Sequence, residues 1–139
     1  MKKSCRILLV EDEDLIRLIL SEAMTDSGFE VVEAATGEAA MARLRRGESF
    51  DLLLTDIQLP GHLDGLDIAR AARSCMPLMP IIFTTGQPDR MDPWMAGSID
   101  TFIPKPYRPS EICAAVRRLT GDHVLHASAP SLESIAKSG

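Results

Sequence analysis

Side chains able to bind a cation and a phosphate group recur along this chain, each close to a short apolar run. The set contains three carboxylates, neighbouring hydroxyls and one ammonium: Glu11, Asp12, Asp56, Thr84, Thr85 and Lys105. Two carboxylates about 4 Å apart repel each other by about 4 kcal/mol at an effective dielectric constant near 20, so such a cluster raises a pKa or recruits a cation. Oxygen ligands select a hard ion, and Mg²⁺ suits an open site that keeps water and meets a phosphate.

The pattern of apolar residues predicts the elements that must position this set. Short runs typical of β-strands alternate five times with segments of helical period, which favours parallel strands joined by crossover helices. In the first helical segment Leu15, Ile19 and Ala23 recur at helical spacing. Strands are expected at 6–10, 30–34, 51–55, 80–84 and 101–103, and helices from Leu15 until Gly28, at 37–46, after the capping residue Asp64, at 87–96, and between Pro109 and Gly121.

The expected sheet brings the polar set together. In an open parallel sheet the carboxyl ends of the strands meet at one edge, and ligands bind there. Four of the five expected strands end in or run into a member of the set, and Gly86 leaves room beside Thr85 for a phosphoryl group or an attacking water. A carboxylate is a weak nucleophile, but it can form an acyl phosphate when neighbouring cations neutralise the phosphoryl oxygens.

Composition limits the class of protein. The chain has 139 residues, 45% of them hydrophobic and 25% charged, which is typical of one globular domain. A formal net charge of −5 disfavours nucleic-acid binding, which requires clustered lysine and arginine. No apolar run reaches the ~18 residues of a membrane span and no signal peptide is recognisable, so we expect a cytoplasmic protein without membrane contact. Cys5, Cys75 and Cys113 form no C-x-x-C pair and are expected to be small core or surface residues.

Four motifs occur in order on the expected strands. They are LLVEDE at 8–13, LLTDIQLP at 53–60 with Asp64-Gly65, PIIFTTG at 80–86 and FIPKPY at 102–107. Together they resemble the motifs of response-regulator receiver domains of two-component signalling, over about residues 4–120. The resemblance implies a flavodoxin-like, doubly wound α/β fold whose five-stranded parallel sheet has the order 2-1-3-4-5 and is accompanied by five helices.

The resemblance also implies roles at the acidic end of the site. Asp56 would accept a phosphoryl group from the phosphohistidine of a histidine kinase or phosphotransfer protein. Glu11, Asp12, Asp56 and the Gln58 backbone carbonyl would hold Mg²⁺ directly or through water. The protein would catalyse only its own phosphorylation and dephosphorylation. It is therefore not expected to be an enzyme that acts on a separate substrate.

The remaining implied roles concern the phosphoryl group and the response to it. Thr85 would hydrogen-bond one phosphoryl oxygen, and Lys105 would pair with another. Phe102 occupies the aromatic switch position, so its rotamer could couple to Thr85, although it lacks a phenol hydroxyl. The peptide bond between Lys105 and Pro106 is expected to be cis.

Two stretches depart from the family pattern. The loop between Asp56 and Asp64 is one residue longer than in the chemotaxis type, with Gly61-His62 in the extra space beside the site. The stretch from Gly86 to Lys105 is about two residues short, and its prolines and glycine weaken the helix predicted at 87–96 and the partner surface that it would form with Trp94.

Other polar residues receive ordinary structural roles. Asp51 and Asp64 are assigned to strand entry and helix capping. His62 is expected to be an exposed loop residue. His123 and His126 have the spacing of metal ligands, but they lie in a tail of low apolar content and are expected to be solvated.

We therefore expect a stand-alone receiver domain at residues 4–121 and a flexible tail at 122–139, signalling to an unknown downstream protein. A receiver cut from a hybrid histidine kinase and a phosphorylation-independent interaction module remain alternatives. A flavodoxin-like cofactor binder is disfavoured because four acids follow the first strand where a phosphate-binding loop is needed. A phosphatase of the haloacid dehalogenase type is disfavoured because Gln58 stands where its second acid is usual.

Overall fold

A computed structural model describes residues 5–87 and 100–121 of the chain. In these ranges the elements are β1 (Arg6–Val10), α1 (Asp14–Asp26), β2 (Glu30–Ala34), α2 (Gly37–Arg45), β3 (Leu52–Asp56), α3 (Gly65–Cys75), β4 (Ile81–Thr85), β5 (Thr101–Pro104) and α5 (Pro109–Thr120). All five predicted strands are present, and their bounds differ from the prediction by at most one residue. Residues 88–96 of the predicted fourth helix, with Trp94, lie outside the described residues, as do His123, His126 and the proposed tail.

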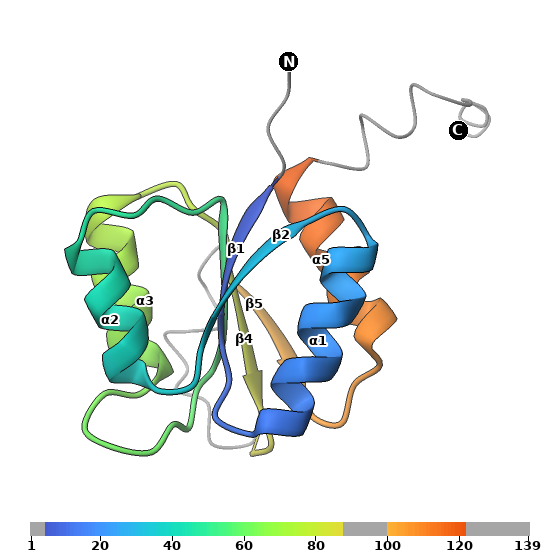
Figure 1. Cartoon of the computed structure of the whole chain (residues 1–139), viewed down its shortest axis with the longest axis horizontal. Helices are drawn as coiled ribbons and strands as arrows, with labels where there is room; N and C mark the ends of the chain where they lie inside the picture. Colours follow the sequence, from blue (N-terminus) through green and yellow to red (C-terminus); the bar gives the residue numbers. More distant parts are fainter. Residues whose placement is uncertain (1–4, 88–99, 122–139) are drawn as a thin grey trace.

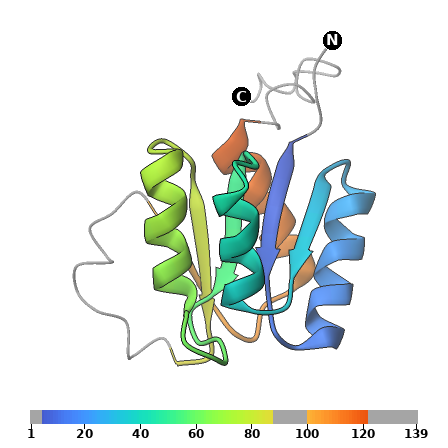
Figure 2. The same ribbon diagram turned by 60° about the vertical axis from the view of Figure 1, so that its left-hand side comes forward.

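The five strands form one parallel sheet with the order β2-β1-β3-β4-β5. Their carboxyl ends all point to the same edge (Figure 2). The register pairs Val10 with Thr55 and Asp56 with Thr84, so the residues that follow these strands lie side by side. The predicted doubly wound fold and strand order are confirmed, and Pro104 lies on an edge strand, where a missing N–H is tolerated.

Helices cover both faces of this sheet. In Figure 1, α2 and α3 lie against one face, and α1 and α5 lie against the other. Alternate residues of β1 serve the two layers, since Leu8 and Val10 pack toward α2 and α3 while Ile7 and Leu9 pack toward α1 and α5. This two-sided burial explains why the central strands are apolar without a break.

Local signals in the sequence set the helix ends. Asp64 caps α3 as predicted: its Oδ1 accepts the N–H groups of Leu66 and Asp67, and Asp67 in turn accepts the N–H of Asp64. Gly121 ends α5 in the left-handed conformation that glycine adopts without strain, at φ 77°. The longest described helix, α1, has 13 residues, and none of the described helices is long and apolar enough to cross a membrane.

The buried face of α1 is not formed by Leu15 and Ile19, two of the residues whose spacing predicted this helix. Leu20 and Met24 are the buried residues of this helix, whereas Leu15 and Ile19 are 68% and 43% exposed. The helix carries a second apolar stripe that does not pack on the sheet, formed by Leu15, Leu18 and Ile19. The helix predicted from the spacing of Leu15, Ile19 and Ala23 is thus confirmed, although Leu15 and Ile19 do not lie on its buried face.

Candidate functional site

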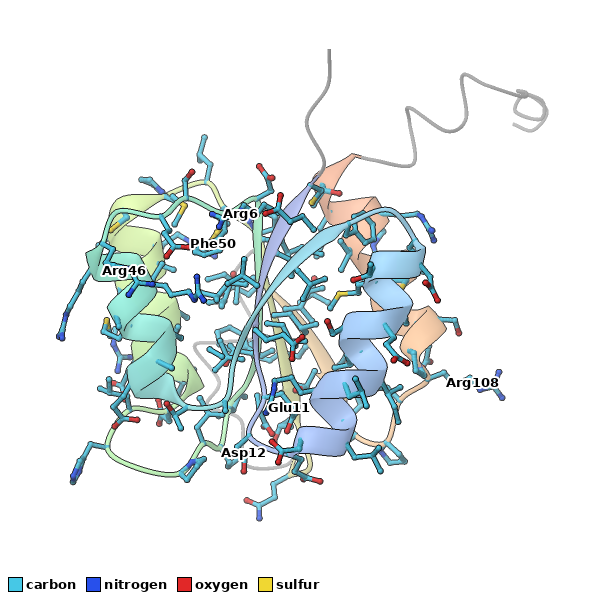
Figure 3. The ribbon with its side chains drawn as sticks, viewed as in Figure 1. Arg6, Glu11, Asp12, Arg46, Phe50 and Arg108 are labelled. Atoms are coloured by element: carbon cyan, nitrogen blue, oxygen red, sulfur yellow. The ribbon has the colours of Figure 1, made fainter. Side chains whose placement is uncertain are left out.

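Three carboxylates converge where β1 and β3 end. Glu11 and Asp12 lie at the edge of the sheet toward which the strands point (Figure 3). One carboxylate oxygen from each of Glu11, Asp12 and Asp56 lies within 4.8 Å of the other two. Glu11 and Asp56 are buried, and Asp12 is exposed. This cluster therefore opens to solvent on the side of Asp12.

Lys105 supplies the positive charge of the site. Its Nζ lies 2.8 Å from Asp56 Oδ2 and 3.4 Å from Glu11 Oε1. The Lys105 N–H donates to the Thr85 carbonyl at 2.8 Å, which fixes the start of the loop after β5 against β4. The Lys105–Pro106 peptide bond is cis, as the resemblance implied. A residue 49 positions from Asp56 is thus its direct ion-pair partner.

The site holds more negative charge than Lys105 can balance. Burial raises the pKa of Glu11, although the Glu13 N–H and Lys105 act in the opposite direction. Burial also raises the pKa of Asp56, against the lowering effect of Lys105. For Lys105, burial favours loss of the proton, but the carboxylates of Asp56 and Glu11 more than offset it and raise its pKa. The ammonium therefore stays charged, and both buried carboxylates would gain from a further cation.

The backbone around Asp56 is fixed by close packing against α3. A Cβ atom on Gly65 would lie 2.2 Å from the Asp56 carbonyl oxygen, so only glycine allows this approach. The Gly65 N–H donates to the Ile57 carbonyl at 2.9 Å. The backbone nitrogen of Gln58 lies 3.3 Å from Asp56 Oδ1, and this hydrogen bond helps to orient the carboxylate. Asp64-Gly65 thus joins the helix cap to the placement of Asp56.

Thr85 ends β4 beside this cluster and is only 1% exposed. Its hydroxyl donates to the side-chain oxygen of Gln58 at 3.0 Å and accepts the N–H of Gln87 at 2.9 Å. A Cβ on the next residue, Gly86, would meet no atom within 4 Å among residues 5–87 and 100–121, so these residues leave space beside Thr85. The sequence predicted a role for the Gln58 carbonyl, but it gave no sign of this side-chain contact.

Phe102 lies one layer below the site. Its ring stacks on Phe83, with centroids 5.2 Å apart and planes inclined by 16°. The register sets Phe102 beside Phe83, whereas Thr85 is paired with Pro104. The ring therefore packs with the core on the α2 and α3 side of the sheet.

Tyr107 is a neighbour of the site that belongs to the motif at 102–107 but received no role in the site from the sequence. Its hydroxyl is buried and has no hydrogen-bond partner within the described residues. Burial and the charge of Glu11 raise the pKa of Tyr107 to about 12. Its place in the motif at 102–107 was the signal that could have indicated this position. The residue type gave no such signal, because a tyrosine that ends an apolar motif is usually a packing residue.

His62 lies outside the cluster and is exposed, as predicted. Its N–H donates to Glu38 Oε2 at 3.1 Å, which ties the loop after β3 to the first turn of α2. The cysteines also match their prediction, because Cys113 is buried, Cys5 is half-buried and Cys75 is exposed.

An apolar cavity of about 290 Å³ adjoins the site between α1 and the loop after β5. Its lining residues are Ile16, Ile19, Leu20, Lys105, Pro106, Tyr107 and Pro109. The exposed stripe of α1 lies beside it, because Ile19 belongs to both. Lys105 also belongs to both, because it lines the cavity and its Nζ contacts Asp56 and Glu11.

Two curated proteins are similar in sequence to this chain. The chain is 30% identical over 116 residues to the alkaline phosphatase synthesis transcriptional regulatory protein PhoP of Bacillus subtilis, a match covering 82% of this chain and 48% of PhoP. It is 42% identical to the response regulator receiver protein CpdR of Brucella abortus over 81 residues, covering 58% of this chain and 66% of CpdR. The chain thus spans about half of PhoP and two thirds of CpdR.

A solved structure agrees with these matches. The response regulator receiver protein from Sinorhizobium medicae superposes with a TM-score of 0.74 at 29% identity, over 86% of this chain and 96% of that one. Residues 7–117 match the family model of the response regulator receiver domain. This match covers all the described strands except the first residue of β1, and it includes every residue of the candidate site. The chain therefore belongs to the response regulator receiver domain family, the phosphorylation-based signalling modules of two-component systems.

Proposed function

We propose that this chain accepts a phosphoryl group on Asp56 from the phosphohistidine of a histidine kinase or phosphotransfer protein, and relays the signal through changed protein contacts. The observation that carries this proposal is the contact between Lys105 Nζ and Asp56 Oδ2 at 2.8 Å, inside a cluster that also holds Glu11 and Asp12. A strand-end carboxylate alone would be unremarkable. Its burial beside one ammonium and two further carboxylates is the arrangement expected of a phosphoryl-transfer site.

The transfer exchanges one bond to phosphorus for another. An Asp56 carboxylate oxygen forms the new O–P bond while the N–P bond of the phosphohistidine breaks, and its electron pair stays on the imidazole nitrogen. Lys105 turns from the carboxylate to a phosphoryl oxygen, and the Thr85 hydroxyl donates to another oxygen. Because phosphoryl transfer has a loose transition state, this positioning and neutralisation is the main work of the protein. Attack of water on the same phosphorus would break the Asp56 O–P bond, release inorganic phosphate and return the free carboxylate. No separate enzyme activity is proposed.

The residues present fit a magnesium ion. Three carboxylate oxygens within 4.8 Å of one another form a hard-oxygen donor set, and one of the three residues is open to solvent. Glu11, Asp12, Asp56 and the Gln58 carbonyl are proposed to hold Mg²⁺, as receiver domains do at their acidic pocket. The bound ion would supply charge neutralisation that Lys105 alone does not provide.

A protein phosphodonor is supported by the apolar surface next to the site. The exposed stripe of Leu15, Leu18 and Ile19 and the adjoining cavity present apolar area beside Lys105. Exposed patches of this kind mark protein contacts. A phosphodonor protein seated there would bring its phosphohistidine within reach of Asp56, whereas a small-molecule donor would gain nothing from this surface.

Phe102 and Thr85 are proposed as the switch residues and residues 4–121 as the receiver domain. A receiver from a hybrid histidine kinase has the same site, so this alternative shares every step above. A phosphorylation-independent interaction module is the competing class. In that case the acidic cluster would bind no phosphoryl group.

The test is intact-mass measurement after incubation with Mg²⁺ and acetyl phosphate. The wild-type chain should gain the mass of one phosphoryl group, and Asp56→Asn should gain none. Asp51→Asn is the matched control, because Asp51 is a carboxylate at the entry of the same strand and accepts the N–H of Arg6 at 2.7 Å. This control should be phosphorylated like the wild type. A wild-type chain that gains no mass, or an Asp56→Asn variant that does, would refute the proposal.

A further inference from the structure

We propose that the Gln58 side chain is a latch on the Thr85 hydroxyl, which must release before that hydroxyl can bind a phosphoryl oxygen. This inference rests on the proposed phosphorylation of Asp56, and it concerns how the resting site is held. Gln58 would act as a positioning residue, because it reaches the phosphoryl group only through Thr85.

The hydrogen bonds of Thr85 leave no free proton for a ligand. A threonine hydroxyl has one proton to donate, and here it is donated to Gln58 Oε1 at 3.0 Å. The hydroxyl oxygen accepts the Gln87 N–H at 2.9 Å, so its orientation is set from both sides. A phosphoryl oxygen can only accept, because it carries no proton when ionised. It therefore competes directly with Gln58 Oε1 for the same proton.

The two partners of this bond differ in freedom to move. Thr85 is buried at the end of β4, whose backbone is paired on both sides by β3 and β5. Gln58 is exposed and belongs to the loop between β3 and α3. Breaking the bond therefore requires only a rotamer change of an exposed side chain into solvent. The latch opens at Gln58, and Thr85 stays in place.

The strengths of the competing bonds give the direction of the change. The resting bond joins a neutral hydroxyl to a neutral amide, whereas the bond to a phosphoryl oxygen is charge-assisted and roughly twice as strong. The phosphoryl group therefore displaces Gln58, and the affinity for it is lowered by the cost of opening the latch. Since one neutral hydrogen bond contributes modestly in water, removing the latch should raise this affinity about twofold to tenfold.

Opening the latch also changes what the loop presents. The Gln58 N–H faces Asp56 Oδ1 at 3.3 Å, so the backbone of this residue stays near the acceptor while its side chain is freed. A released carboxamide with two donors and an acceptor would then extend from the loop beside the phosphoryl group. Occupancy of the site is thereby converted into a new polar group on its rim.

The test is titration of the full chain with beryllofluoride in the presence of Mg²⁺, followed by calorimetry. Gln58→Met keeps the length of the side chain and removes its hydrogen-bonding groups. This variant should bind beryllofluoride about twofold to tenfold more tightly than the wild type. The same substitution should have no effect in a Thr85→Val background, where no hydroxyl proton remains to be latched. In a Thr85→Ser background, which keeps the hydroxyl, the gain should return.

A second measurement reads the latch without relying on affinity. The side-chain carboxamide resonances of Gln58 should move toward solvent-exposed values when beryllofluoride is added to the wild type. Thr85→Val without beryllofluoride should produce the same movement, and Thr85→Ser should not. A purely steric role of Gln58 predicts no difference between the valine and serine variants.

The outcomes separate the latch from the function on which it rests. If the wild type binds beryllofluoride but Gln58→Met binds it equally, or gains equally in the valine and serine backgrounds, the latch is wrong and the phosphoacceptor proposal stands. Gln58 resonances that stay unchanged on binding also overturn it. If the wild type neither binds beryllofluoride nor gains mass from acetyl phosphate, Asp56 is no phosphoacceptor and both proposals fail.

Discussion

Charged residues gather at both ends of the sheet, but the two ends differ in how far their carboxylates are paired with cations. At the amino-terminal end, Arg6 and Phe50 lie far from Glu11 and Asp12 at the other end (Figure 3). The Arg6 guanidinium stands over the Phe50 ring at 4.8 Å and bonds both Glu30 and Glu48, at 3.1 and 3.2 Å. Glu48 also accepts from Arg43 and Arg46. Glu30 and Glu48 thus each have at least one cation, and the network is partly exposed.

At the carboxyl-terminal end the balance is reversed. Glu11 and Asp56 are buried and share the single ammonium of Lys105. Burial raises the pKa values of these two acids, whereas at Glu48 the hydrogen bond from Arg46 outweighs burial and the pKa is lowered. Unbalanced buried charge costs stability, and a fold keeps it where a ligand can balance it. The difference therefore assigns one end of the sheet to stability and the other to binding.

Magnesium should produce the largest contrast between the two ends. The free energy of unfolding rises with the concentration of a ligand that binds only the native state, by about 2.7 kcal/mol at 100 times its Kd. Saturating Mg²⁺ should therefore raise the Tm by several degrees, and Asp12→Ala should abolish this rise. Asp51→Ala removes a carboxylate at the other end, so it should lower the Tm but keep the full response to Mg²⁺. Thermal unfolding with Mg²⁺ or EDTA checks this, and a retained response in Asp12→Ala would remove Asp12 from the site.

Neutralising Asp56, the proposed phosphoacceptor, should stabilise the metal-free protein. The raised pKa of Asp56 means that the folded state binds this proton more tightly than the unfolded state does. Stability therefore falls as the pH rises from 3.8, the ordinary pKa of aspartate, through the higher folded value. Asp56→Asn should raise the Tm by a few degrees at pH 7 in EDTA.

Thermal unfolding of wild type and Asp56→Asn from pH 4 to 8 checks the sign. The advantage of the variant should shrink on acidification, because the wild-type carboxyl then takes up a proton. A lower Tm for Asp56→Asn at neutral pH would show that the ion pair with Lys105 outweighs burial. Asp51→Asn should instead change the Tm little, because its amide oxygen can still accept the Arg6 N–H.

The sequence predicted which residues meet at the edge of the sheet better than it predicted the hydrogen bonds that their side chains make. Strand ends follow from apolar runs, and parallel pairing then forces Glu11, Asp56 and Thr85 to one edge whatever their rotamers are. The convergence of Lys105 follows from the same geometry. The Gln58 to Thr85 bond does not, because it depends on the rotamer of an exposed side chain across a distance of 27 residues.

The face of α1 could not be predicted for a related reason. Apolar residues occur on two adjacent stripes of this helix, and periodicity alone does not say which stripe meets the sheet. Packing against α5 and β2 selects the stripe of Leu20 and Met24 and leaves Leu15 and Leu18 outside. The stripe that remains outside is the one that supports the proposed protein partner.

Removing Arg6 should destabilise the protein modestly at the amino-terminal end. Arg6→Met keeps some contact with Phe50 but loses the cation over the ring, the bonds to Glu30 and Glu48, and a bond to the Ser49 carbonyl. Partly exposed contacts of these kinds sum to about 1 kcal/mol. Urea unfolding at pH 7 checks this, with Arg46→Met as the control, because Arg46 is more exposed and bonds only Glu48 in this network. Binding of beryllofluoride should be unchanged in both variants.

The smallest effect should come from Glu48→Gln, and its dependence on pH is the informative part. Arg46 and its neighbours lower the pKa of Glu48, so its contribution to stability is present above the ordinary value of 4.5 and disappears as the pH falls through the lower folded value. Glu48→Gln should thus be less stable than the wild type at pH 7. The loss should be slight, because the amide oxygen still accepts bonds from the arginines, and it should vanish on acidification. Asp56→Asn should show the opposite sign over the same range, an advantage that vanishes on acidification. Urea unfolding of both variants from pH 3 to 7 measures the two trends side by side. Equal signs would mean that the two ends of the sheet do not differ in charge balance, and the inference from that balance to a binding site would lose its physical basis.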